Sequence, residues 1–196
     1  MKGSELTPND IIQAYVSGLF PMAEPGTDEI YFYRADPRGL IPLDDRFHIP
    51  HGLKRTLKKK PFEIRIDTAF REVITACSRP HDPDEQWIDD NIIRLYCELH
   101  DMGFAHSIEC WDKDGLQGGL YGVAIRRAFF GESMFHRKSD ASKVALVALV
   151  NLLRAHDFLY LDTQWPTEHI KKFGTYEIPD KEYKKLLKQA ITYEKN

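Results

Sequence analysis

The chain has few cysteines and no long hydrophobic run. Its 196 residues include only three cysteines, Cys77, Cys97 and Cys110, an odd number without metal-site spacing. That usage predicts reduced, buried thiols, as in a cytosolic protein. There is no run of 18 apolar residues, and the N-terminus lacks the apolar segment of a signal peptide. These absences predict a cytoplasmic protein without a membrane span.

Several sequence patterns of known chemistry are also missing. There is no P-loop and no GxGxxG motif, the histidines are scattered without zinc spacing, and no serine has an evident base nearby in sequence. The basic, glycine-rich turn that binds coenzyme A in ordinary acetyltransferases is not visible. The formal net charge of −3 excludes a polycation, so any contact with nucleic acid must come from a local patch.

The stretch 116–135 is the most informative part of the chain. It predicts a hairpin of strands 116–125 and 128–135, with Glu132 in the middle of the second strand. A carboxylate inside an apolar strand is costly unless it is paired or used, and the glycines within 118–122 mark the close approach of another backbone or a ligand. The stretch therefore predicts a lined cleft; the alternative is an edge strand with a solvated Glu132.

The hydrophobic pattern predicts helices alternating with short strands. Thr7 and Pro8 open a helix that should end at Gly18. Further helices are expected at 51–60, 68–77, 87–102, 140–153 and 180–192, strands at 30–33, 62–67, 105–111 and 158–161 besides the hairpin, and a polar loop at 78–85. Strand 62–67 should be half-buried, and Asp140 should cap helix 140–153. The three strands within 105–135 should form an antiparallel meander, which predicts an α+β fold with helices covering an antiparallel-rich sheet.

The helix at 51–60 concentrates positive charge in an acidic protein. Leu53 and Leu57 form its apolar stripe. Its cationic residues are Lys54, Arg55, Lys58, Lys59 and Lys60. A solvated helix face is the common explanation, and contact with a phosphate backbone is the alternative. If the helix binds RNA, we expect it to lie beside the catalytic cleft.

Asp162 and Gln164 end the buried strand 158–161 with polar side chains. Residues i and i+2 of a strand point to the same side, so the two side chains can meet. An Asp that accepts from the amide of a Gln leaves the amide oxygen able to accept a proton from an ammonium group. The alternative is a strand-end turn in which Asp162 caps the following residues.

A series of short motifs over about residues 18–180 resembles one protein family. In chain order the motifs are GLFPMAEPG, PRGLIPLD, WIDDNI, HSIECW, GGLYGV, FFGESMF, DASK and DTQ. They resemble the leucyl/phenylalanyl-tRNA–protein transferases, and GESMF followed by ASK is the most specific part. The resemblance implies transfer of Leu or Phe, or Met, from aminoacyl-tRNA to the N-terminal Arg or Lys of proteins, which marks them for degradation. It also implies a GNAT-like acyltransferase fold of residues 61–196 behind a small N-terminal domain of residues 1–60.

The same resemblance assigns roles to individual residues. Glu132, Asp162 and Gln164 match the catalytic positions. Two aromatic residues would line the terminal adenosine, Tyr33 by stacking and Trp111 as a second wall. The apolar aminoacyl pocket would contain Leu120, Phe130 and Met134. The resemblance implies no metal and no coenzyme A, and a monomer is expected.

The chain departs from the family pattern at several positions. Arg126 and Arg127 stand where a small pair is usual, His136 replaces a serine, Tyr33 replaces a tryptophan, and Trp165 follows the glutamine. These departures leave open a second function, a non-catalytic binder of basic N-termini or RNA 3′ ends. A coenzyme-A-dependent acetyltransferase on the same fold is a weaker alternative.

Overall fold

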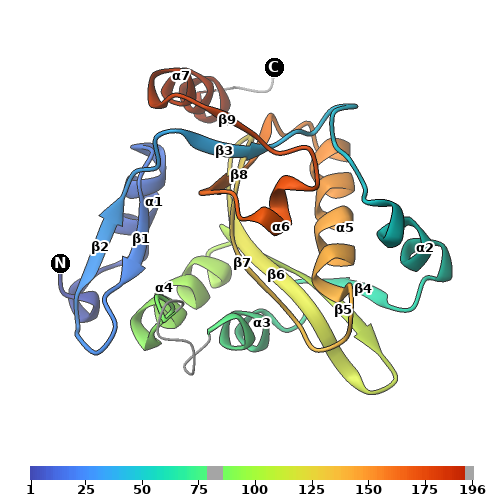
Figure 1. The fold of residues 1–196 in the computed structure, drawn as a ribbon. Helices are drawn as coiled ribbons and strands as arrows, with labels where there is room; N and C mark the ends of the chain where they lie inside the picture. Colours follow the sequence, from blue (N-terminus) through green and yellow to red (C-terminus); the bar gives the residue numbers. More distant parts are fainter. Residues whose placement is uncertain (79–85, 193–196) are drawn as a thin grey trace.

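A seven-stranded sheet forms the centre of this computed structural model, which describes residues 1–78 and 86–192 (Figure 1). Its strand order is β4-β5-β6-β7-β8-β3-β9. The strands are β3 (Arg38–Ile41), β4 (Glu63–Ile66), β5 (Ala105–Asp112), β6 (Gly115–Ile125), β7 (Ala128–His136), β8 (Tyr160–Gln164) and β9 (Tyr176–Ile178). Strands β5, β6 and β7 form the predicted antiparallel meander, and β8 then pairs in parallel with β7. The result is a mixed, mostly antiparallel sheet.

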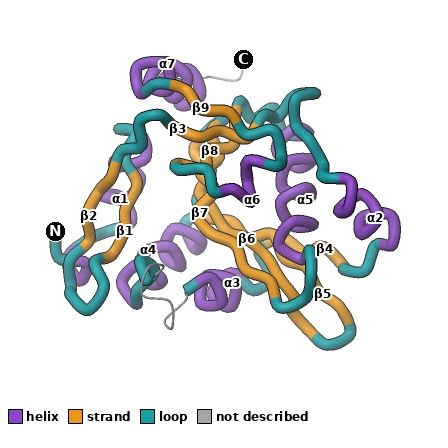
Figure 2. The backbone as a smooth tube through the Cα atoms, viewed as in Figure 1, coloured by secondary structure: helices purple, strands orange, loops and turns teal. Residues whose placement is uncertain are grey.

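Helices cover both faces of this sheet (Figures 1 and 2). They are α1 (Pro8–Val16), α2 (His51–Lys59), α3 (Phe70–Cys77), α4 (Asp90–Asp101), α5 (Ala141–Ala155), α6 (Glu168–Lys171) and α7 (Asp180–Ile191), with a 3-10 turn at Gly3–Glu5. One apolar core lies under α1, α3, α4 and α7, and the other lies under α5 and α2. A separate hairpin of β1 (Phe20–Ala23) and β2 (Ile30–Tyr33) stands beside α1.

Most predicted elements are confirmed, and their ends follow local hydrogen bonds. Helix α1 opens with a capping box between Thr7 and Asp10. Helix α4 begins three residues later than predicted, because the Asp89 carboxylate accepts from the Ile92 backbone and fixes the first turn there. The prediction that Asp140 caps α5 was wrong, since its carboxylate instead accepts from Thr56 and Lys143.

Several elements differ from expectation. Strand β4 was predicted to be half-buried, but it is an edge strand with exposed Ile64 and Ile66. Helix α6 and strand β9 were not predicted. Of the predicted loop at 78–85, residues 79–85 lie outside the described residues. Strand β3 lies inside the sheet, between β8 and β9, while the domain boundary at residue 60 stays a prediction.

The three cysteines are buried, and none of them takes part in a disulfide. Across residues 1–78 and 86–192, no helix has both the length and the hydrophobicity that crossing a bilayer requires.

Candidate active site

Glu132 owes its position to a bulge between β6 and β7. Tyr121 lies opposite Ser133 and Gly122 opposite Gly131, so Glu132 is the extra residue of β7. Bulges bend a strand and re-aim side chains, often next to active sites. Gly122 permits this geometry, because a Cβ there would lie 2.3 Å from the carbonyl oxygen of Phe130. The predicted close approach of backbones at the glycines is confirmed, and Glu132 is in an interior strand.

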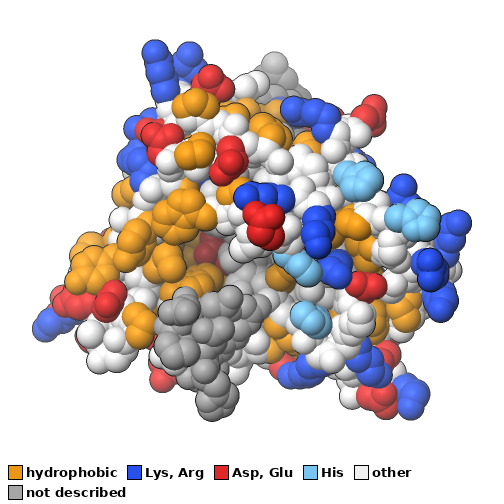
Figure 3. Space-filling view, in the orientation of Figure 1, with side chains coloured by type: hydrophobic (Ala, Val, Ile, Leu, Met, Phe, Trp, Pro, Cys, Tyr) orange, Lys and Arg blue, Asp and Glu red, His pale blue; other side chains and the backbone are white. Residues whose placement is uncertain are grey.

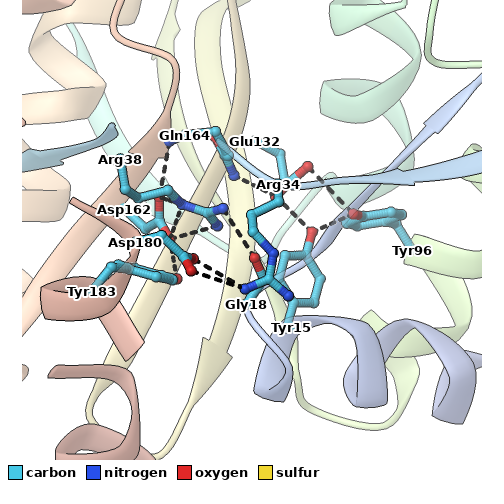
Figure 4. A network of polar contacts seen from close by, with 10 residues as sticks. All are labelled: Tyr15, Gly18, Arg34, Arg38, Tyr96, Glu132, Asp162, Gln164, Asp180 and Tyr183. Atoms are coloured by element: carbon cyan, nitrogen blue, oxygen red, sulfur yellow. Dashed lines mark hydrogen bonds and ion pairs between the residues drawn. The ribbon is translucent and has the colours of Figure 1, made fainter. Parts of the chain in front are cut away.

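The Glu132 carboxylate is held by three polar side chains from distant parts of the chain (Figure 4). Tyr15 of α1 donates to Oε1 at 2.6 Å, and Tyr96 of α4 donates to Oε2 at 3.3 Å. The Gln164 amide donates to Oε1 at 3.1 Å, and the two tyrosine hydroxyls bond to each other. Burial raises the pKa of Glu132 from its usual 4.5 to about 8, although the two tyrosine hydrogen bonds lower it. Glu132 is therefore poised to exchange a proton near neutral pH.

This raised pKa predicts a pH dependence of stability. Because the folded protein binds the Glu132 proton more tightly than the unfolded chain does, the free energy of unfolding should fall as pH rises from about 4.5 to about 8. Each unit of pKa difference corresponds to roughly 1.4 kcal/mol. Urea unfolding of the wild type and Glu132→Gln across this range measures the effect, since the Gln variant lacks the titrating group. The prediction fails if the two stability curves run parallel.

Asp162 belongs to a separate, fully buried ion pair (Figure 4). Arg38 of β3 donates to both carboxylate oxygens, with Nε to Oδ1 at 2.9 Å and Nη2 to Oδ2 at 2.9 Å, and both side chains are 0% exposed. Tyr183 of α7 donates to Oδ2 at 2.5 Å. The Arg38 guanidinium also lies 4.5 Å from the Tyr183 ring centre and donates to the Gly18 carbonyl. This pair joins β3, β8 and α7 behind the site.

The predicted contact between Asp162 and the Gln164 amide was wrong. Asp162 accepts from the Gln164 backbone N–H at 2.9 Å, and the amide side chain turns to Glu132. Gln164 has a backbone φ of +53°, in the left-handed region that residues other than glycine rarely adopt. Asp162 therefore acts through the backbone, by holding Gln164 in this conformation.

The predicted aminoacyl pocket residues do not share one face of the sheet. Leu120 and Met134 are cross-strand partners in the core under α5. Phe130 belongs to the opposite core, where its ring packs 4.7 Å from Tyr15. Of the three, only Phe130 therefore lies on the face of Glu132, and a common pocket stays a prediction.

The two aromatic residues predicted to line the terminal adenosine, Tyr33 and Trp111, also lie in different parts of the fold. Tyr33 ends β2, next to Trp165 and Phe20. Trp111 lies near the far end of β5, where its indole N–H donates to the buried Glu109 at 2.9 Å. Glu109 also accepts from the backbone N–H groups of Thr68 and Ala69, just before α3. Trp111 thus supports a structural network at the start of α3, and its predicted contact with adenosine is untested.

The basic helix α2 lies on the α5 face of the sheet. Leu53 packs in the core under α5, and Thr56 donates to Asp140 at 2.8 Å. The Glu132 carboxylate instead accepts from Tyr15 of α1 and Tyr96 of α4. These two helices lie on the opposite side of the sheet from α5 (Figure 1). The structure therefore does not place α2 beside Glu132, contrary to expectation, and this favours the alternative of a solvated helix face. Contact of its basic residues with tRNA stays a prediction.

Sequence reasoning missed the tyrosines that hold Glu132 and the arginine that holds Asp162. Tyr15 and Tyr96 sit at helical core positions, where a tyrosine is usually a packing residue. Arg38 offered a signal, because it precedes the apolar segment 39–43, where an unpaired charge would be costly.

Comparison with known proteins points to one family. A family model described as leucyl/phenylalanyl-tRNA protein transferase matches residues 40–188, and a model of its N-terminal domain matches residues 4–36. A leucyl/phenylalanyl-tRNA–protein transferase of Akkermansia muciniphila is 70% identical over 186 residues, which cover 95% of this chain and 96% of the relative. Those of Herpetosiphon aurantiacus and Salinibacter ruber are 52% and 49% identical, each over 95% of this chain and over 95% and 81% of the relative.

These matches define the class of the protein as an aminoacyltransferase. The chain belongs to the leucyl/phenylalanyl-tRNA–protein transferase family, which confirms the resemblance read from its motifs.

Proposed function

We propose that this protein transfers Leu or Phe from charged tRNA to the N-terminal Arg or Lys of acceptor proteins. The observation that carries the proposal is the pairing of Glu132 with the Gln164 amide in a partly buried site. Among the described residues none donates to Gln164 Oε1, so this oxygen is available to a substrate amine. An acceptor with a charged α-amine and a charged side chain favours the ionised form of Glu132, because a nearby positive charge lowers the pKa of a carboxyl group.

The chemistry is aminolysis of the aminoacyl ester. The acceptor amine attacks the ester carbonyl, the new C–N bond forms, and the C–O bond to the tRNA ribose breaks. The acceptor ammonium loses one proton to solvent before it attacks, and the nitrogen passes a second proton to the departing ribose oxygen, which leaves as a hydroxyl. Gln164 Oε1 accepts a hydrogen bond from the amine and orients it, while Glu132 polarises the Gln164 amide and offsets the positive charge. Positioning supplies much of the acceleration, since the ester is already activated.

The fold supports the same assignment, and we infer that it is GNAT-like. An antiparallel meander leads into α5, which crosses over to the parallel strand β8. Strands β7 and β8 pair from Ala128 to Phe130 only, so Glu132 and Gln164 lie just past the end of that pairing. A monomeric state, a cytoplasmic location, the two-domain division at residue 60 and a role in protein degradation belong to this proposal as well.

A transfer assay tests the proposed function. It combines tRNAs charged with labelled Leu, Phe, Met or Ala and peptides that begin with Arg, Lys or Ala. We expect product with Leu and Phe donors and with Arg and Lys acceptors, and none with the Ala-starting peptide. Peptide binding without transfer from any donor would instead favour a non-catalytic binder.

The basic helix gives a separate prediction about tRNA. Its exposed lysines neutralise backbone phosphates if the acceptor stem runs over the α5 face. The triple variant Lys54→Glu, Lys58→Glu, Lys59→Glu should raise the KM for charged tRNA at least about tenfold and reduce the salt dependence of binding by roughly one unit of slope per lysine.

Two controls accompany this variant. A minimal aminoacyl-adenosine donor has no stem, so its KM should not change. The matched variant Lys181→Glu, Lys185→Glu, Lys188→Glu alters three exposed lysines of α7. Equal losses with both donors, or in both triple variants, would show that α2 is only a solvated face.

A further inference from the structure

Trp165 is a large, exposed aromatic side chain directly after Gln164. Its side chain is 49% exposed, and the neighbouring Tyr33 is 37% exposed. The Trp165 ring packs edge-on against Phe20, with centroids 5.0 Å apart, and lies 6.2 Å from the Tyr33 ring. In Figure 3, hydrophobic side chains gather on this side of the molecule, over β1 and β2. We call Phe20, Tyr33 and Trp165 the aromatic shelf.

The backbone on both sides of Trp165 is constrained. Asp162 holds the Gln164 backbone N–H, with Gln164 in its left-handed conformation. Pro166 packs against Gly39 of β3, where a Cβ would lie 2.5 Å from the proline Cδ. Trp165 is therefore presented on a fixed turn, with its ring supported by Phe20. An ordered, half-exposed tryptophan beside reactive groups loses little entropy on binding a ligand.

The chemistry of the shelf fits an unpaired nucleobase. Its exposed rings offer π-faces, on which bases stack with little regard to sequence. The aminoacyl ester must reach Gln164, so the nucleotides next to it in the single-stranded 3′ end must pass close to residue 165. The acceptor peptide enters with its positive charges directed to the Glu132 carboxylate instead.

We propose that Trp165 is a stacking platform for the nucleotide that precedes the aminoacylated terminal nucleotide of the tRNA. The proposal rests on the proposed function, because it assumes that charged tRNA is the donor. It assigns to Trp165 a role in donor binding and none in the chemical step. Tyr33 on the same shelf is then free to contact the terminal nucleoside.

Three donors of increasing length test this role in the full-length protein. They are aminoacyl-adenosine, an aminoacylated dinucleotide and charged tRNA. Trp165→Ala should raise the KM of the dinucleotide and of charged tRNA by about 5- to 30-fold, as expected for loss of one stacked base, with kcat little changed. The KM of aminoacyl-adenosine should stay the same. Trp165→Phe, which keeps a ring, should recover most of the loss.

The controls separate the possible outcomes. Met102→Ala removes another exposed apolar side chain, 53% exposed, at the end of α4, and should affect no donor. Equal effects on all three donors, an effect only on the KM of the acceptor peptide, or no effect would overturn the proposal. Failure of the proposed function would look different, because the wild-type protein would then transfer from none of the donors.

Discussion

Replacement of Asp162 by Ala should lower the free energy of unfolding by about 3–5 kcal/mol, the usual cost of removing one partner of a buried ion pair. Arg38 is 0% exposed, and it would lose its acceptor while remaining out of water. Tyr183 would lose its acceptor as well. Because Asp162 also holds the Gln164 backbone, kcat should fall in the same variant. Urea unfolding at pH 7 measures the stability change.

An exposed pair in the same protein provides the control. Asp44 and Arg46 form an ion pair with side chains 56% and 62% exposed, so water screens their attraction and Asp44→Ala should cost far less stability than Asp162→Ala. The double variant Arg38→Met, Asp162→Ala should be more stable than Asp162→Ala alone, since it removes the unpaired buried charge. A cost for Asp162→Ala no larger than that for Asp44→Ala would show that the buried pair is not a structural anchor.

Replacement of Gln164 by Ala should reduce kcat for transfer by about 10²–10³, the range seen when one positioned polar group is removed from an active site. In the proposed mechanism the Gln164 amide oxygen contacts the acceptor amine, while the amide nitrogen donates to Glu132. Stability should fall only modestly, because the Glu132 oxygen that loses the Gln164 amide keeps its hydrogen bond from Tyr15. Steady-state transfer of labelled Leu to an Arg-starting peptide measures kcat.

Gln189→Ala, on the exposed side of α7, is a matched substitution that should leave kcat unchanged. A folded Gln164→Ala enzyme with wild-type kcat would contradict the proposed contact of Gln164 with the acceptor amine. A variant that is inactive because it is unfolded would also remove the support for this contact.

The sequence revealed those site residues that are polar but stand in apolar strands. Glu132 stands in an apolar strand, and Asp162 with Gln164 ends another, so both conflicts are visible without a structure. Their mutual arrangement was not visible, because it depends on the β6–β7 bulge and on the left-handed Gln164. A regular strand places residues i and i+2 together, which wrongly favoured a contact between the Asp162 and Gln164 side chains.

Residues that act over long sequence separations were the hardest to predict. Tyr15 and Tyr96 lie 81 residues apart, yet their hydroxyls meet at Glu132. Trp111 shows the converse difficulty, because its residue type fits two different roles. The motif HSIECW has an exact structural explanation in the buried Glu109 network at the start of α3, and sequence alone could not separate that role from ligand binding.

The most direct test of the account is a double-mutant cycle on the rate of a single turnover. The cycle uses three variants: Glu132→Gln, Gln164→Ala and the double variant. Each enzyme is mixed with charged tRNA and an Arg-starting peptide, with the enzyme in excess over the charged tRNA. If Glu132 acts together with the Gln164 amide, the double variant should be about as slow as the slower single variant, because residues that act as a unit are non-additive. Rate losses that multiply would show that the two residues act independently, and would contradict the central claim.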